Sequence, residues 1–170
     1  MALTKICGDS MSLFGDDRYQ WRETYFVLFE LTERPLSSDV VDALSQRSER
    51  YSVTDVQADA EGRFESLTLQ SPEDFSAMDI TFVTGEEVAE HIEELSREIA
   101  KSTLTDDGRK KLARLQRCDA RFDIYHFEQV ANQVGDAEDF LDPGSLIIVL
   151  KRLTKLCHGI GIDPQSGMLM

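Results

Sequence analysis

The segment Arg22–Leu31, with five consecutive apolar residues at Tyr25–Phe29, is the clearest strand of the sequence. Successive side chains of a strand point to opposite sides, so this stretch would present apolar residues on both of its faces. The first face carries Tyr25, Val27, Phe29 and Leu31, and the second carries Phe26 and Leu28. This pattern predicts a central strand that is covered on each side, or one that lies at an interface.

Further segments with a two-residue period predict the rest of a β-sheet. The group Asp59-Ala60-Glu61-Gly62 favours a turn, and the alternating stretches on both sides of it predict a β-hairpin. In chain order, the other expected strands are Tyr51–Ala58, Arg63–Gln70, a half-buried Ala77–Val83, Asp119–Val130, and a short final hairpin of Ile160–Ile162 with Met168–Met170.

Four segments have the apolar spacing of amphipathic helices. The clearest runs from Gly85 to about Lys101, and Thr84 with Glu87 would form a capping box at its start. Its narrow apolar stripe predicts packing on the sheet or on another helix. The stripe consists of Val88, Ile92, Leu95 and Ile99. The other helices are expected from Ser37 or Ser38 to about Arg47, from Thr105 or Asp106 to Arg117, and from Asp142 to about Cys157.

This order of elements predicts an α+β fold. With one strand set aside, the order is βαββαβ, which is the split-βαβ or ferredoxin-like pattern. We expect a two-layer sandwich, with a mainly antiparallel sheet, helices packed on one face and a short C-terminal hairpin. Residues 1–20 would form an N-terminal arm and residues 21–170 a single domain. The expected core comprises Tyr25, Phe26, Val27, Leu28, Phe29, Ile80, Phe82, Ile92, Leu95, Phe122, Ile124, Leu146, Val149, Leu150 and Leu153.

The charge of the chain narrows the classes of partner. Its 170 residues include 18 Lys and Arg against 32 Asp and Glu, for a formal charge of −14. Phosphate binding requires clustered cations, so we expect neither nucleic acid nor an anionic membrane surface as a partner. The longest apolar runs have five residues, and the N-terminus lacks the apolar stretch of a signal peptide. We therefore expect a cytoplasmic protein.

The cysteines and glycines carry no cofactor motif. Cys7, Cys118 and Cys157 are widely spaced, which is typical of reduced thiols in the cytoplasm. Gly159 and Gly161 follow an expected helix, whereas a dinucleotide loop needs a helix after its glycines. We expect no cofactor, and the catalytic signatures GxxxxGK[ST], GxSxG and HExxH do not occur.

One pair of residues could bind a ligand or a metal. His126 and Glu128 share a face of the expected strand Asp119–Val130, so their side chains would stand next to each other. A zinc site needs three or four ligands, so a partly buried, hydrogen-bonded histidine is the favoured interpretation. His158 would serve as a capping charge at a helix end, unless the fold brings it close to that pair.

Two neighbouring stretches have opposite charge. Residues 85–101 hold six glutamates, and residues 109–121 hold six Lys and Arg. The basic stretch lacks the interleaved aromatic residues of a single-strand nucleic-acid site. Two oppositely charged helices packed side by side, or two solvated faces, are favoured instead.

Three short segments resemble uncharacterised bacterial α+β proteins. They are Gly159–Gly167, Glu61–Leu67 and Cys118–Asp123, and they cover less than a quarter of the chain. The resemblance includes no catalytic motif and implies no activity. It implies a bacterial cytosolic protein of unknown function.

The absence of a converging nucleophile, base or metal set favours a non-enzymatic role. The first hypothesis is a binding or interaction module that works through a sheet edge or face with a protein or a small ligand, a homodimer being one form that it could take. The alternative is a small enzyme or a metal-dependent ligand-binding protein with a pocket near His126 and Glu128.

Overall fold

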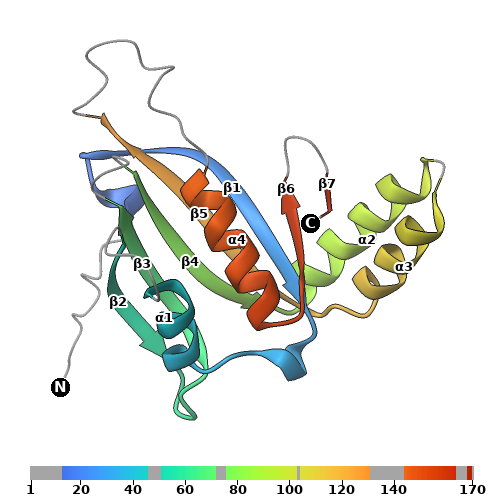
Figure 1. Cartoon of the computed structure of the whole chain (residues 1–170), viewed down its shortest axis with the longest axis horizontal. Coiled ribbons are helices and arrows are strands. Elements are labelled where there is room, and N and C mark those ends of the chain that lie inside the picture. The colour runs from blue at the N-terminus through green and yellow to red at the C-terminus, as the bar shows by residue number, and fades with distance from the viewer. Residues whose placement is uncertain are drawn as a thin grey trace.

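The protein is built on one antiparallel β-sheet with the strand order β2-β3-β4-β5-β1-β6-β7 (Figure 1). The computed structural model describes residues 13–45, 51–71, 76–102, 104–130, 144–163 and 168–169. The strands are β1 (Tyr19–Phe29), β2 (Ser52–Ala58), β3 (Phe64–Ser71), β4 (Ser76–Thr84), β5 (Ala120–Gln129), β6 (Ile160–Asp163) and β7 (Met168–Leu169). The helices are α1 (Ser37–Ser45), α2 (Glu86–Ala100), α3 (Asp106–Leu115) and α4 (Gly144–Leu156), with short 3-10 helices η2 (Leu13–Gly15) and η3 (Leu31–Glu33).

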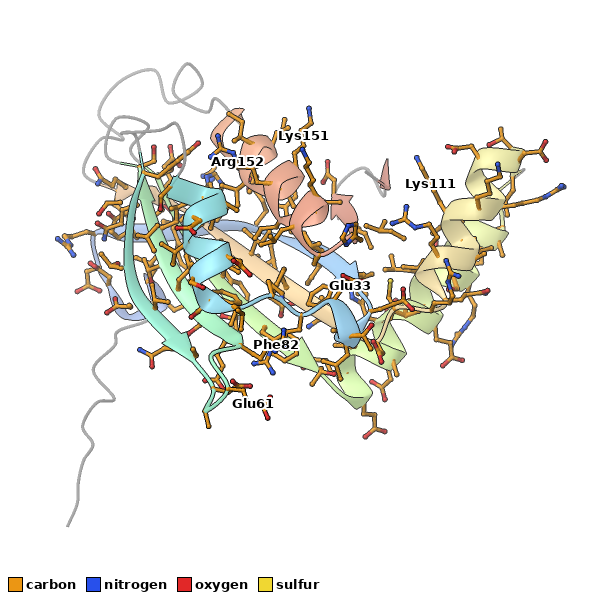
Figure 2. All side chains as sticks on the ribbon, turned by 60° about the horizontal axis from the view of Figure 1, so that its bottom comes forward. Glu33, Glu61, Phe82, Lys111, Lys151 and Arg152 are labelled. Atoms are coloured by element: carbon orange, nitrogen blue, oxygen red, sulfur yellow. The ribbon has the colours of Figure 1, made fainter. Side chains whose placement is uncertain are left out.

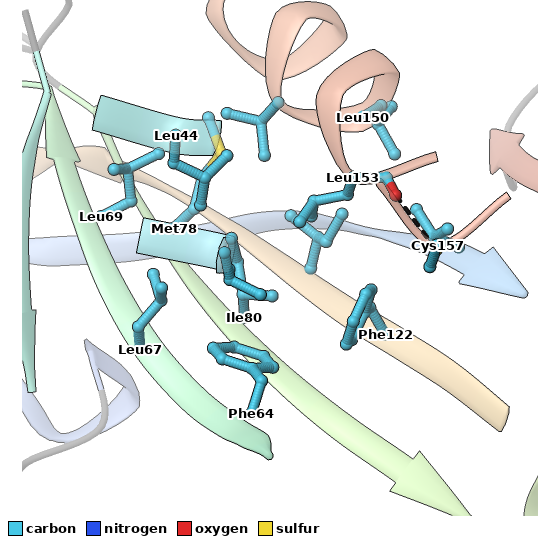
Figure 3. Packing of buried hydrophobic residues seen from close by; sticks show 14 of the residues in the cluster. Leu44, Phe64, Leu67, Leu69, Met78, Ile80, Phe122, Leu150, Leu153 and Cys157 are labelled. Atoms are coloured by element: carbon cyan, nitrogen blue, oxygen red, sulfur yellow. Dashed lines mark hydrogen bonds between the residues drawn. The ribbon is translucent and has the colours of Figure 1, made fainter. Parts of the chain in front are cut away.

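Helices α1 and α4 pack against one face of the sheet and enclose the main core. Figure 3 shows Leu44 of α1 and Leu150 and Leu153 of α4 above Ile80 and Phe122 of the central strands. Phe29 of β1 belongs to the same core and has no exposed surface. The two-residue period of each strand therefore directs every second side chain into this layer.

Helices α2 and α3 pack against the opposite face, at the end of the sheet where β1 and β6 pair. Val88 and Ile92 of α2 and Leu115 of α3 are buried there with Leu28 of β1. At the other end of this face, the buried Leu13 of η2 packs on Phe127. Strand β1 is thus a central strand covered on both sides, as its sequence predicts.

The predicted α+β class and antiparallel sheet are confirmed, but the ferredoxin-like arrangement is not. Strand β1 lies between β5 and β6 in a longer sheet whose order differs from a simple ferredoxin-like one. The helices also cover both faces rather than one. The reason lies in β1 and α2, because Leu28 needs cover on the second face and the apolar stripe of α2 supplies it.

The predicted start of α2 is also wrong in detail. The Thr84 hydroxyl donates to the Asp119 carbonyl, and Gly85 occupies the N-cap position without a side-chain hydrogen bond. Glu87 bonds to Arg121 instead of capping the helix. A tertiary ion pair has therefore replaced the local capping box.

Most of the residues predicted for the core are fully buried, and the others are partly buried. Tyr25, Phe26, Phe82 and Leu95 are partly buried rather than fully enclosed. Of the predicted arm, residues 13–20 include the buried Leu13 and the start of β1, while residues 1–12 lie outside the described residues. No helix in the described part of the chain is both long and apolar enough to cross a membrane.

Candidate functional site

A buried polar cluster lies on the second face of the sheet, between α2 and η2. On β5, Arg121, Asp123 and Tyr125 alternate with Phe122 and Ile124, which face the main core. Their alternation sends the three polar side chains to the face that α2 and η2 cover only in part. The strand therefore carries an apolar side that is enclosed and a polar side that is covered in part.

Arg121 and Asp123 form the centre of this cluster. The Nε atom of Arg121 donates to Asp123 Oδ1, and its Nη2 atom donates to Asp123 Oδ2 at 3.0 Å. The two side chains are only 5% and 6% exposed. This is a bidentate ion pair, the geometry in which a guanidinium holds a carboxylate most firmly.

Helix α2 contributes the other two partners of Arg121. Nη2 of Arg121 donates to Glu87 Oε1 at 3.0 Å, and its Nη1 lies 3.1 Å from Nδ1 of His91. A guanidinium has no acceptor, so Nδ1 of His91 must accept this hydrogen bond. The neutral imidazole then carries its proton on Nε2. Glu87 and His91 are four residues apart, which places both on one face of the helix.

The environment of His91 favours its neutral form. Burial lowers the pKa of His91 below its ordinary value of 6.5, and the positive charge of Arg121 lowers it further. The ring of Phe26 meets the imidazole edge to face, with 4.7 Å between the ring centroids. His91 is therefore held between an arginine and an aromatic ring and is uncharged at neutral pH.

Tyr125 completes the cluster on the side of η2. Its hydroxyl donates to Asp123 Oδ2 at 3.3 Å, and burial raises its pKa. Beyond it, the buried Asp79 accepts a hydrogen bond from the backbone N–H of Leu13 and another from the hydroxyl of Thr68. These bonds hold η2 against the sheet, so the cluster has a fixed boundary at this end.

Two adjoining hollows open beside the cluster and together form what we call the α2 groove. The smaller, of about 260 Å³, is lined by Thr24, Phe26, Glu87, His91, Arg121, Asp123 and Tyr125. The larger, of about 510 Å³, is lined by Phe26, His91, Glu94, Leu95, Glu98, Ile99, Ser102 and Ile162. Phe26 and His91 line both hollows, so a single ligand could contact the polar cluster at one end and the apolar wall at the other.

The described residues offer the groove no activated nucleophile or metal centre. Burial raises the pKa of Cys118 to about 11 and that of Cys157 to about 12, so both are thiols at neutral pH. Within the described ranges, no three His, Cys, Asp or Glu side chains are grouped so that they could hold a metal ion. The arrangement is suited to binding and orienting a ligand.

The residues predicted from the sequence lie elsewhere. His126 is on β5 but on the face of α4, where its Nδ1 lies 3.2 Å from Glu23 Oε1 and its side chain is 12% exposed. Glu128 pairs with Arg22 at 3.5 Å. His158 follows α4 and lies 3.2 Å from Glu33, with its side chain 75% exposed. Glu23 is near the start of β1 and Glu33 lies beyond its end, so the fold does not bring His158 to His126.

The two oppositely charged stretches include helices that lie side by side. Figure 2 shows the side chains of α2 and α3, including Lys111, spreading outward from a helical hairpin. Their exposed ion pairs join residues three or four apart on one helix, as in Arg97–Glu93 and Lys111–Asp107. Arg114 instead donates to the carbonyl of His158, which joins α3 to the end of α4.

The sequence patterns did not predict a site made of Arg121, Asp123, Glu87 and His91, and they assigned Glu87 to a capping box instead. The usable signals were an Arg-x-Asp pair on one face of a strand and a Glu-x-x-x-His pair on one face of a helix. Neither signal says that the two faces meet. No protein-family model, curated protein or solved structure matches the chain.

Proposed function

We propose that the protein is a non-enzymatic binding module whose ligand lies in the α2 groove. The observation that carries this proposal is the groove itself, in which an open hollow of about 510 Å³ shares Phe26 and His91 with a smaller hollow beside the buried polar cluster. Ligand sites are typically hollows of about 300–1,000 Å³ with apolar walls and a few fixed polar groups. Phe26, Leu95, Ile99 and Ile162 supply the wall, and His91 and Arg121 supply fixed polar groups.

The widely spaced cysteines favour a cytoplasmic location, and the charge of the chain disfavours nucleic acids and anionic membranes as partners. A net charge of −14 repels polyanions, and the cations of the groove are already engaged by carboxylates. The apolar residues on both faces of β1 had suggested a homodimer. Because the helices of the same chain cover Leu28 and Phe29, this feature is accounted for within one copy.

A neutral, environment-sensitive dye tests whether the groove binds an apolar ligand. Nile red should bind saturably to the wild-type protein with a blue-shifted emission. Ile99→Gln removes part of the apolar wall and should weaken binding about tenfold, because a buried aliphatic side chain supplies that much affinity. Ala100→Gln is the matched control, since Ala100 is the next residue of α2 and is exposed.

Circular dichroism of both variants would verify that the helix content is kept. If Nile red shows no saturable binding, or binds Ile99→Gln as tightly as it binds the wild type, the groove is not a ligand site.

The second candidate function is a small enzyme or a metal-dependent ligand-binding protein near His126 and Glu128. One observation bears on it: Nδ1 of His126 lies 3.2 Å from Glu23 Oε1, so an imidazole and a carboxylate meet on neighbouring strands. Metal analysis of the purified protein, repeated on His126→Ala, tests this function. A bound metal that is lost in the variant would support it, and metal-free wild-type protein would exclude the metal-dependent form.

A further inference from the structure

We propose that the ligand of the α2 groove is a small organic cation with an apolar body, such as an alkyl amine. This inference rests on the proposed function and adds the chemical class of the ligand. It depends on how charged and apolar residues are distributed along the two hollows.

Carboxylates line the helix side of the groove. Glu87, Glu94 and Glu98 follow one another on the same face of α2, because intervals of seven and four residues return to the same side of a helix. Glu94 and Glu98 line the larger hollow, directly beside Leu95 and Ile99. A ligand whose hydrocarbon part lies on the apolar wall would therefore place its head group near a carboxylate.

The cations near the groove do not cancel these charges. Four carboxylates line the two hollows, against the single guanidinium of Arg121, which is engaged by Asp123 and Glu87. Lys101 pairs with Glu98 at 3.1 Å, and both side chains remain largely exposed. His91 adds no charge at neutral pH because its pKa is lowered. The field in the groove therefore attracts a cation and repels an anion.

The opposite wall suits the hydrocarbon part of the same ligand. Phe26 of β1 and Ile162 of β6 are register partners in the sheet, so their side chains lie next to each other. Leu95 and Ile99 of α2 continue this apolar lining on the helix side, beside Glu94 and Glu98. The ring of Phe26 already attracts a positive charge, because Cζ of Arg121 lies 5.0 Å from its centroid.

A matched set of three probes separates charge from hydrophobicity. Hexylammonium, hexanol and hexanoate share one hydrocarbon chain and differ in the charge of the head group. We expect hexylammonium to bind most tightly, followed by hexanol and then hexanoate, measured as amide chemical-shift changes along α2 in a ¹⁵N-labelled sample at pH 7.

Glu94, which lines the larger hollow, provides the decisive variant. Glu94→Gln should weaken hexylammonium roughly fivefold, which is the contribution of one charge pair about 4 Å apart in water, and leave hexanol unchanged. Glu93→Gln is the matched control, because Glu93 carries the same charge one residue away, pairs with Arg97 and does not line the groove. It should leave the affinities for both probes unchanged.

The outcomes distinguish this inference from the function on which it rests. If hexanol or hexanoate binds as tightly as hexylammonium, or if Glu93→Gln and Glu94→Gln behave alike, the cation class is wrong while the groove remains a binding site. If Nile red binds and none of the three hexyl probes does, the cation class is also wrong. If neither Nile red nor any hexyl probe binds, both proposals fail.

Discussion

Replacing Arg121 with methionine would test whether the buried polar cluster stabilises the fold. The substitution keeps an apolar stem but removes both hydrogen bonds to Asp123 and those to Glu87 and His91. Asp123 would then be a buried carboxylate with the hydroxyl of Tyr125 as its remaining side-chain partner in the cluster. Breaking one side of a buried ion pair costs about 3–5 kcal/mol, because the other charge is left desolvated.

A loss of this size is a large fraction of the roughly 5–15 kcal/mol by which domains are usually stable. Urea denaturation followed by circular dichroism would measure it as a lower midpoint with an unchanged slope. The double variant Arg121→Met with Asp123→Leu should recover most of the loss, because it no longer contains an unpaired buried charge.

The control for Arg121 is another arginine in an ion pair. Arg97 pairs with Glu93 at 3.0 Å, but their side chains are 70% and 68% exposed. Arg97→Met should cost less than about 1 kcal/mol, since exposed pairs are weak. The reasoning is refuted if Arg121→Met costs no more than Arg97→Met, or if the double variant is no more stable than the single one.

Three further predictions concern pH, the core and a close backbone contact. Because the pKa of His91 is lowered in the folded state, the unfolded chain takes up a proton first as the pH falls below 6.5, and the protein loses stability down to the folded pKa. His91→Gln should flatten the pH profile of the urea midpoint in this window, and a variant profile as steep as that of the wild type would contradict the prediction. Phe29→Ala should cost about 3–5 kcal/mol because its side chain has no exposed surface, and an unchanged melting temperature would show that it is not in the core. Gly159→Ala would place a Cβ 2.5 Å from a backbone carbonyl oxygen of β1 and should lower the free energy of unfolding by about 1–3 kcal/mol. A Cβ at Gly15 has nothing within 4 Å, so Gly15→Ala should change that free energy by no more than about 0.5 kcal/mol. Equal losses for the two variants in calorimetry would refute this prediction.

The individual elements were largely predictable because their signals are local. The apolar run Tyr25–Phe29, the turn before Arg63 and the apolar stripe of α2 each depend on residues within a few positions. The Thr105 hydroxyl accepts the backbone N–H of Gly108, which is the local N-cap that begins α3. The capping box at Thr84 failed because Glu87 has a stronger partner in Arg121, far away in the chain.

The candidate site was not predictable in the same way. Arg121 belongs to a basic stretch that could equally have been a solvated surface, and 34 residues separate it from Glu87 and 30 from His91. His126 and Glu128 were more conspicuous in the sequence, yet each has one charged partner on a neighbouring strand. The His-x-Glu pair on β5 was therefore a weaker guide to the candidate site than the way in which α2 covers the second face of the sheet.

The sequence by itself determined which segments become strands and helices, and that β1 must be covered on both sides, since period, turns and caps act between near neighbours. Only the tertiary structure decided that β1 lies between β5 and β6, and that α2 covers Leu28 rather than joining α1 and α4. These choices depend on packing between distant residues, where many pairings of similar apolar faces are locally equivalent. The groove exists because α2 crosses a face that carries Arg121 and Asp123, and that juxtaposition is a property of the assembled fold.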